Sequence, residues 1–418
     1  MSGKVADKLP WQKGGYGGGA LKLLVITYWD QGDPLVVNYT LPYLRQILGI
    51  LPRGSRIHLV TLDKEQRKGS TIDGEAGILH HSFPYRPFGM RGMVALPSLV
   101  MALRGIVEKH RIDVVHAWCT PAGMLGYLVS VLSRRPLVVD SYEPHAEAMV
   151  ENGTWRKGGV AFRILFLFER LQTRRAAAVV AAASGMREYA KQRYGMVPQH
   201  FYVKPACVDL ARFAAQRNGE GGASRPPGLQ GKLVAVYAGK FGGIYLGQEV
   251  FDLFRAARDH WGEKFHVLLL TSHTAEELAP YMLGAGLPPG MFTVQWAKPQ
   301  EVPEFLAMAD WAITPVKPVP TKRFCTPIKD GEYWAAGLPV MITPGISDDS
   351  DLIASHAIGS VIHTLDRAGY EQAVHDMDQV LKNEDRPQLQ ARIRAIAERY
   401  RSFRIAEQVY RDLYGAAG

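Results

Sequence analysis

The chain has 418 residues, which is long enough for two domains with separate hydrophobic cores. Its 47% hydrophobic and 21% charged residues are those of an ordinary globular protein, and no apolar stretch approaches the roughly 20 residues that span a bilayer. The formal net charge of +9 favours anionic partners such as phosphorylated ligands, lipid head groups or nucleic acid. Three widely spaced cysteines, Cys119, Cys207 and Cys325, form neither a zinc pattern nor a disulfide framework, which fits a reducing cytoplasm.

Residues 1–20 contain a Gly-rich run without an apolar core, which predicts a disordered tail and not a secretion signal. From residue 21 onward, short apolar runs alternate with helical patterns, as is typical of βαβ units and a parallel sheet. The predicted strands are Leu21–Tyr28, Arg56–Thr61, Ile78–Phe83, Asp113–Trp118, Leu137–Asp140, Ala178–Ala182 and Phe201–Pro205. The predicted helices lie around Leu41–Leu51, Leu96–His110, Phe162–Ala176 and Met186–Tyr194. These elements predict a first domain over residues 21–213.

Residues 214–231 are rich in Gly, Pro, Ser and Arg and read as a linker. A second alternating set predicts another domain over residues 232–390. Its predicted strands are Leu233–Ala238, His266–Thr271, Phe292–Trp296, Trp311–Pro315, Pro339–Thr343 and Gly359–Ile362, with helices at Gln248–Trp261, Val302–Ala307 and Asp330–Ala336 between them. A long charged helix is expected at the end of the chain, about Gln388–Tyr414. Doubly wound domains bind ligands outside the carboxyl ends of their strands, so the cleft between the domains is the expected site.

A glycine-rich segment, Gly239-Lys-Phe-Gly-Gly243, follows the first predicted strand of the second domain. Glycines let backbone N–H groups approach a phosphate closely, and Lys240 adds a positive charge. Gly239, Gly242 and Gly243 are therefore expected to bind phosphate together with Lys240. A plain Gly-rich turn with an exposed lysine would give the same pattern.

A cation and a carboxylate, Lys329 and Glu332, stand three residues apart at the start of a predicted helix. Residues at this spacing share a helix face and can contact one ligand. Helix N-termini attract anions because their free N–H groups and dipole point at them. A phosphate beside Lys329 and a sugar hydroxyl on Glu332 would describe a bound nucleotide sugar, whereas a surface ion pair on a capped helix is the alternative.

A polar loop follows the predicted strand Leu137–Asp140 and contains Tyr142, Glu143 and His145, with Pro144 stiffening it. A histidine in this place can hydrogen-bond a sugar hydroxyl or a phosphate oxygen without carrying a permanent charge. A histidine that caps a helix or satisfies a buried carbonyl is the alternative.

Other polar residues are given structural interpretations. His116 ends a predicted strand and is left out of the catalytic set, and Lys204 is expected to fix the turn between the domains. Asp348, Asp349 and Asp351 are expected to form an exposed acidic helix cap, and no metal site is predicted.

Two helical segments, residues 86–111 and 154–176, mix Lys and Arg with aromatic and Met side chains. Basic amphipathic helices of this kind can lie in the interface of an anionic membrane, although core packing would explain the apolar residues equally well. No nucleic-acid-binding fold or aromatic RNA platform is evident, so nucleic acid is not an expected partner.

The donor-site signature of retaining GT-B glycosyltransferases, the family 4 group, resembles the run Pro327-x-Lys329-x-x-Glu332-Tyr333-x-Ala335-Ala336-Gly337-x-Pro339-Val340. The similarity extends from about Leu21 to Tyr414. It implies a GT-B fold: two doubly wound, Rossmann-like α/β domains facing a cleft, with a C-terminal helix, residues 391–418, crossing back to the first domain.

The resemblance also implies roles for the candidate residues of the donor site. Glu332 would bind the ribose hydroxyls of the nucleotide, and Thr326 and Pro327 would border the donor. Lys240 and Lys329 would stabilise the leaving diphosphate. Phe324 stands where the family has the first acid of its paired-glutamate motif, so this chain departs from the pattern there and shows no carboxylate nucleophile.

In the first domain, the resemblance gives His145 the catalytic role of orienting the donor sugar, and Glu143 and Tyr142 become substrate ligands. The expected function is transfer of a hexosyl or related sugar from a nucleotide diphosphate-sugar to a hydroxyl of a glycan, glycolipid or lipid-linked saccharide, with retention and without a metal or other cofactor. A cytoplasmic enzyme of polysaccharide biosynthesis, peripheral on the inner face of an anionic membrane, would fit. A nucleotide-sugar epimerase of the same fold, a non-catalytic partner subunit and a peripheral membrane adaptor remain as alternatives.

Overall fold

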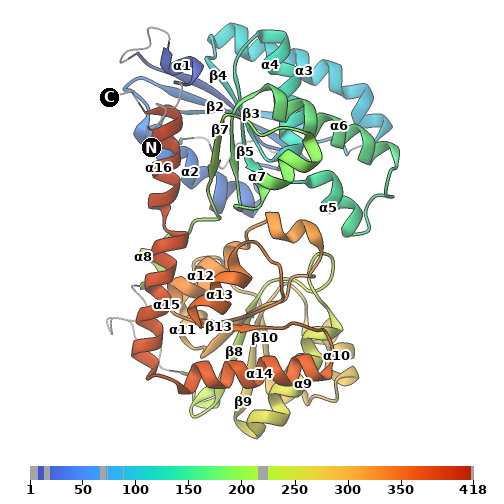
Figure 1. The fold of residues 1–418 in the computed structure, drawn as a ribbon, viewed down its shortest axis with the longest axis vertical. Coiled ribbons are helices and arrows are strands. Elements are labelled where there is room, and N and C mark those ends of the chain that lie inside the picture. The colour runs from blue at the N-terminus through green and yellow to red at the C-terminus, as the bar shows by residue number, and fades with distance from the viewer. Residues whose placement is uncertain are drawn as a thin grey trace. The chain divides into compact units, whose positions relative to one another are not determined.

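The chain folds into two compact α/β units (Figure 1). The computed structural model describes residues 8–13, 19–65, 72, 74–87, 89–214 and 225–415. The first unit comprises Met1–Lys204 and Arg404–Gly418, and the second comprises Pro205–Phe403. Each unit contains one sheet in which all pairings are parallel, so the prediction of two α/β domains with parallel sheets is confirmed.

The first unit is built on a seven-stranded sheet in the order β3-β2-β1-β4-β5-β6-β7. Its strands are β1 (Lys22–Ile26), β2 (Arg56–Asp63), β3 (Ile78–Pro84), β4 (Val114–Trp118), β5 (Leu137–Tyr142), β6 (Ala176–Ala181) and β7 (His200–Val203). Its helices are α1 (Pro10–Lys13), α2 (Leu41–Ile50), α3 (Met90–His110), α4 (Thr120–Ser133), α5 (His145–Glu151), α6 (Val160–Arg175), α7 (Met186–Tyr189) and α16 (Phe403–Tyr414). The central strands β1 and β4 are almost wholly buried apolar runs, as expected for a parallel sheet that is covered on both faces.

The second unit is built on a six-stranded sheet in the order β10-β9-β8-β11-β12-β13. Its strands are β8 (Leu233–Ala238), β9 (Phe265–Leu270), β10 (Phe292–Gln295), β11 (Trp311–Thr314), β12 (Val340–Ile342) and β13 (Gly359–Val361). Its helices are α8 (Leu210–Ala214), α9 (Gln248–Trp261), α10 (Ala275–Gly284), α11 (Val302–Ala307), α12 (Ile328–Ala336), α13 (Asp349–His356), α14 (Arg367–Lys382) and α15 (Arg386–Arg401). One apolar cluster covers each face of this sheet, one around Trp334 and the other around Phe251.

The prediction of a disordered tail over residues 1–20 is wrong for residues 8–13. Pro10–Lys13 form α1, and both Leu9, just before this helix, and Trp11 within it are buried. The Trp11 indole N–H donates to the Leu413 carbonyl at 2.7 Å, and the ring stacks on Tyr414. The Trp11 side chain therefore joins α1 to α16. Residues 1–7 and 14–18 of the predicted tail, and 215–224 of the predicted linker, lie outside the described residues.

The expected single terminal helix, residues 391–418, is two helices that belong to different units. At Ser402 the backbone takes the extended conformation, with φ −65° and ψ 143°, and this break separates α15 from α16. Helix α15 packs on α12 in the second unit, whereas α16 packs in the first (red in Figure 1). The segment that crosses back is therefore residues 404–418.

A buried polar network holds α16 in the first unit. The Tyr410 hydroxyl donates to Asp140 Oδ2 at 2.8 Å, and the Tyr414 hydroxyl shares a hydrogen bond with His116 Nδ1 at 2.7 Å. Lys204 Nζ lies 3.4 Å from Asp140 Oδ1 and 4.0 Å from the centre of the Tyr43 ring. Although burial opposes it, the Lys204 charge and the hydrogen bonds from His116 and Tyr410 hold the pKa of Asp140 below its ordinary value. His116 and Lys204 thus have structural roles within this unit.

None of the helices in the described ranges is both long and apolar enough to cross a membrane.

Tyr410→Phe should lower the free energy of unfolding by about 1–3 kcal/mol, because it removes the hydrogen bond that the buried Asp140 Oδ2 accepts from the Tyr410 hydroxyl. Denaturant unfolding monitored by circular dichroism measures the change. The matched control is Tyr127→Phe, at a half-buried tyrosine on α4, for which a change below about 0.5 kcal/mol is expected. Equal stability of Tyr410→Phe and the wild type would show that this hydrogen bond does not hold α16.

Candidate functional site

The N-terminus of α12 presents a buried lysine. The helix begins at Ile328, and its N-cap residue, Pro327, provides no side-chain hydrogen bond to the first turn. Lys329 is 7% exposed, and its Nζ has no hydrogen-bond partner among the described residues. Burial lowers the pKa of Lys329 to about 8, against the opposing charges of Asp330 and Glu332. A buried ammonium without a hydrogen-bond acceptor is costly, and an anionic ligand at this helix terminus would supply one.

Two tyrosine rings enclose the Lys329 ammonium. Nζ lies 4.1 Å from the centre of the Tyr245 ring and 4.8 Å from that of Tyr237. Such cation–π contacts are worth about 0.5–2 kcal/mol, so they replace only part of the lost hydration. The rings therefore hold the charge in place and leave its hydrogen-bonding capacity free for a ligand.

The glycine segment after β8 lies against the same lysine. A Cβ atom on Gly239 would stand 2.7 Å from Lys329 Nζ and 2.8 Å from the Tyr237 hydroxyl, so a side chain here would displace the lysine or the tyrosine. Gly242 and Gly243 have φ of +77° and +64°, which favours glycine. The Tyr237 hydroxyl donates to the Lys240 carbonyl at 2.5 Å, which fixes the turn. The Lys240 side chain itself is exposed.

Glu332 lies one turn further along α12 and is half-buried. Burial raises the pKa of Glu332 to about 6, while the charges of Arg212 and Lys329 oppose the increase. The structure therefore brings Lys329, Glu332 and the glycine segment together in the second unit, as the sequence predicts. The carboxylate is ionised above pH 6 and can accept hydrogen bonds from hydroxyl groups.

The loop that follows β12 contacts the segment directly before α12. The Thr326 and Ser347 hydroxyl oxygens are 3.0 Å apart, and the Ser347 N–H donates to the Lys322 carbonyl at 2.9 Å. Phe324 ends a short 3₁₀ helix, Pro320–Phe324, and is half-buried. Thr326 and Pro327 thus lie directly before the exposed N–H groups of α12, and an aromatic side chain takes the place of the missing acid.

Two buried acidic residues that the sequence does not pair, Asp330 of α12 and Asp349 of α13, hold α12 against the core of the second unit. Asp330 accepts a hydrogen bond from the Thr314 hydroxyl at the end of β11, and Asp349 is paired with Arg401 of α15. Burial and the neighbouring Asp349 carboxylate raise the pKa of Asp330 well above its ordinary value. Both causes favour the protonated form of the Asp330 carboxyl group. The expectation that Asp349 belongs to an exposed acidic cap is wrong, because its side chain is fully buried.

In the first unit, His145 and Glu143 lie together at the start of α5. His145 Nδ1 is 3.3 Å from Glu143 Oε1, and the histidine side chain is 30% exposed. His145 lines a cavity of about 230 Å³ whose other walls include Tyr85, Met149 and Trp155. This placement leaves the imidazole open to a ligand in that cavity.

Tyr142 does not line a site, and its predicted role as a substrate ligand is wrong. Strand β5 continues to Tyr142 through an irregularity at Ser141, which has φ of +49°, instead of ending at Asp140. The irregularity turns the Tyr142 side chain into the core, where it is fully buried. Its hydroxyl hydrogen-bonds Thr173 Oγ1 at 2.5 Å.

Glu169, another residue that the sequence analysis did not select, positions the start of α5. Its carboxylate is fully buried and accepts hydrogen bonds from the Ala146 N–H at 2.8 Å and from the Tyr194 hydroxyl at 3.0 Å. Burial raises the pKa of Glu169 to about 8, although these hydrogen bonds oppose the increase. A lone Glu among the arginines of α6 is a weak sequence signal, since such residues are usually solvated.

Lys329→Met should raise the free energy of unfolding at pH 7 by roughly 1–3 kcal/mol, because methionine fills the site without a buried charge. In the folded protein the Lys329 pKa of about 8 lies below the ordinary lysine value of 10.5. Between these pH values only the unfolded chain still binds the proton, so the free energy of unfolding of the wild type rises with pH. The advantage of the variant should therefore shrink from pH 8 to pH 10.5. Chemical denaturation across this range measures it, with the exposed Lys240→Met as the control. A variant less stable than the wild type at pH 7 would contradict the assignment.

Glu169→Gln should flatten the dependence of stability on pH. Because the Glu169 pKa of about 8 in the folded protein lies above the ordinary glutamate value of 4.5, the folded wild type holds a proton between these pH values that the unfolded chain has lost. The free energy of unfolding of the wild type should thus decrease from pH 4.5 to pH 8. The Glu169→Gln variant should not show this decrease. Unfolding at several pH values provides the measurement, and the exposed Glu188→Gln should keep the wild-type slope. Parallel curves for wild type and Glu169→Gln would argue against a protonated Glu169.

Part of the chain is similar in sequence to a known family, and nearly all of it is similar in fold to solved structures. Residues 43–207 match the family model described as a glycosyl transferase 4-like domain. No curated protein sequence matches the chain.

Solved structures match almost the whole chain at low sequence identity. HepE of Anabaena in complex with UDP is 16% identical with a TM-score of 0.68, over 94% of this chain and 99% of HepE. Sucrose-phosphate synthase of Thermosynechococcus elongatus is 14% identical with a TM-score of 0.69, over 95% and 100% of the two chains. WaaG, a glycosyltransferase involved in lipopolysaccharide biosynthesis, is 14% identical with a TM-score of 0.66, over 94% and 98%. The predicted GT-B fold is therefore confirmed, and residues 43–207 are similar to a glycosyl transferase 4-like domain.

Proposed function

On the premise of a GT-B glycosyltransferase fold, we propose that this protein transfers a sugar from a nucleotide diphosphate-sugar to a hydroxyl acceptor, with retention of configuration. One observation carries the proposal: Lys329 is a buried cation without a hydrogen-bond partner in the described structure, and it lies at an uncapped helix N-terminus beside a glycine-rich turn. A diphosphate supplies the negative charge and the acceptor oxygens that such a place lacks. HepE, which shares the fold, has been crystallised with UDP and with UDP-glucose, and we propose a uridine diphosphate donor here.

The chemistry follows from where charge develops. As the glycosidic bond breaks, negative charge accumulates on the leaving diphosphate. Lys329 and the first N–H groups of α12 would stabilise it from fixed positions, and the exposed Lys240 would approach from the glycine turn. Because Lys329 is held by aromatic rings, little reorganisation accompanies the reaction.

Glu332 would accept hydrogen bonds from the ribose hydroxyls. Its raised pKa of about 6 means that donor affinity should decline as the pH falls below 6 and the carboxylate takes up a proton. We assign His145 to the donor sugar and Glu143 to the substrate beside it. The nearby carboxylates do not provide a nucleophile pair: Phe324 replaces the first acid, and the Asp330 side chain is buried on the core side of α12.

The acceptor is proposed to be a glycan, glycolipid or lipid-linked saccharide, and the place of action the cytoplasmic face of a membrane. An epimerase of the same fold would interconvert nucleotide sugars without an acceptor, and product analysis in the absence of acceptor distinguishes the two reactions.

A thermal-shift and calorimetry panel with UDP, GDP, ADP and CMP tests the donor site. UDP at about 100 times its dissociation constant should stabilise the wild type by about 2.7 kcal/mol. Glu332→Ala and Lys329→Met should each weaken binding about 10- to 100-fold, because each removes a charge-assisted contact. The exposed Glu304→Ala in the same unit is the matched control and should bind like the wild type. Absence of binding by all four nucleotides would remove the basis for a glycosyltransferase and favour a partner subunit or adaptor.

A further inference from the structure

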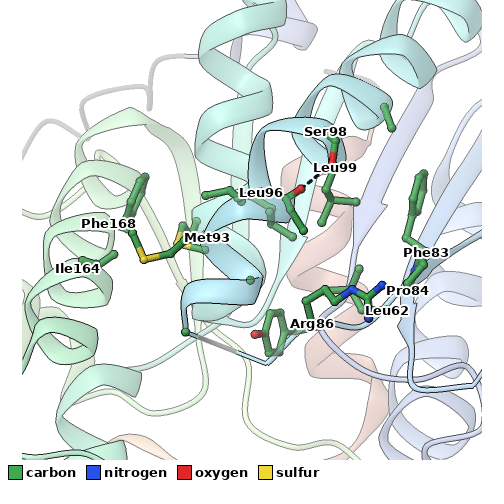
Figure 2. Close-up of a pocket in the computed structure, with 17 residues that line it drawn as sticks. Leu62, Phe83, Pro84, Arg86, Met93, Leu96, Ser98, Leu99, Ile164 and Phe168 are labelled. Carbon is green, nitrogen blue, oxygen red and sulfur yellow. Dashed lines mark hydrogen bonds between the residues drawn. The ribbon is translucent and has the colours of Figure 1, made fainter.

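The first unit contains an apolar cavity larger than the one beside His145. It has a volume of about 500 Å³ and lies between the carboxyl ends of β1, β2 and β3 and the helices α3, α4 and α6 (Figure 2). Its walls are mainly apolar and include Leu62, Phe83, Met93, Leu96, Leu99 and Phe168. Arg86 is the charged residue among the described side chains that line it. The size is that of a small-molecule site, and a single charged group among mainly apolar walls favours an amphiphilic ligand.

The three helices around the cavity also expose apolar side chains to solvent. Helix α4 packs against both α3 and α6, so these side chains belong to one region of the unit. The exposed large apolar residues on the three helices are Met93, Val94, Met101, Val131, Leu132, Val160 and Leu167. Val94 and Val160 are 81% and 72% exposed. A concentration of this kind marks a surface that meets an apolar partner.

The same helices carry excess positive charge. Helices α3 and α6 contain Arg91, Arg104, Lys109, Arg163, Arg170, Arg174 and Arg175. Their acidic residues are Glu108, which pairs with Arg104 at 2.7 Å, and the buried Glu169. Cations beside exposed apolar groups complement a ligand that combines an apolar chain with phosphate.

This cavity adjoins the one that contains His145, and a loop brings Arg86 to its wall. Tyr28 and Met124 line both this cavity and the one that contains His145. Gly92 lets the loop after β3 approach α3, because a Cβ there would stand 2.5 Å from the Pro87 carbonyl oxygen. That loop carries Arg86 to the cavity wall (Figure 2). A chain in the large cavity would therefore place its polar end near Arg86 and toward His145.

We propose that this cavity binds the hydrocarbon chain of a lipid phosphate and that the acceptor of the reaction is a saccharide or hydroxyl carried on such a lipid. The assignment of the lipid as acceptor rests on the proposed glycosyltransferase function, but binding of the chain does not. Arg86 pairs with the phosphate, and the apolar side chains on α3, α4 and α6 rest against the bilayer from which the lipid comes.

Calorimetric titration of the full chain with dodecyl phosphate below its critical micelle concentration tests the proposal. Dodecyl phosphate should bind, whereas ethyl phosphate, which lacks the chain, and dodecyl maltoside, which lacks the phosphate, should bind at least about tenfold more weakly. Ala95→Trp fills the cavity and should weaken binding about tenfold or more, while Val94→Trp, next to it but outside the lining, should not. Arg86→Gln should weaken binding about tenfold, and Arg91→Gln should have little effect.

Circular dichroism and the UDP-induced thermal shift verify that each variant is folded. If Ala95→Trp does not fold, Ala102→Phe, at an exposed lining position, replaces it. Failure of dodecyl phosphate to bind, or unchanged binding by both cavity-filling variants, overturns the proposal. A protein segment would then be the expected occupant of the cavity. UDP binding without lipid binding refutes only the lipid, whereas lipid binding without nucleotide binding refutes only the transferase.

Discussion

The buried charge of Lys329 is the constraint on which the site of the second unit depends. A lysine that is 7% exposed loses most of its hydration, and no hydrogen bond within the described residues replaces it. The tyrosine rings compensate only in part. A buried lysine of this kind is useful when a ligand accepts its hydrogen bonds. The same desolvation that destabilises the free protein then strengthens the attraction between the ammonium and a bound anion.

The surroundings of Lys329 follow from this constraint. Gly239 has no side chain because the ammonium and the Tyr237 hydroxyl occupy the space, and the turn after it brings Tyr245 to the charge. Behind the helix, the Asp330–Asp349 pair ties α12 to β11, α13 and α15. Successive residues of one helix thus serve opposite purposes, since Lys329 faces the ligand and Asp330 faces the core.

Much of this arrangement could be predicted from the sequence because it depends on local pattern. Apolar runs of strand length alternating with helices imply parallel sheets, and a Lys and a Glu three residues apart share a helix face whatever the fold. Residues set by tertiary contacts could not be found in this way. Tyr142 is buried because an irregularity at Ser141 extends β5, and Asp349 is buried because Arg401, 52 residues away, reaches it. Glu169 and Trp11 likewise have partners that sequence spacing does not reveal.

The central claim is that the Lys329 ammonium binds a diphosphate, and a crystal structure of the protein with UDP tests it most directly. The structure should show a phosphate oxygen within hydrogen-bond distance of Lys329 Nζ, near the first N–H groups of α12, with the ribose hydroxyls on Glu332. A diphosphate bound elsewhere, with Lys329 still enclosed by Tyr237 and Tyr245 and without contact to it, would contradict the claim.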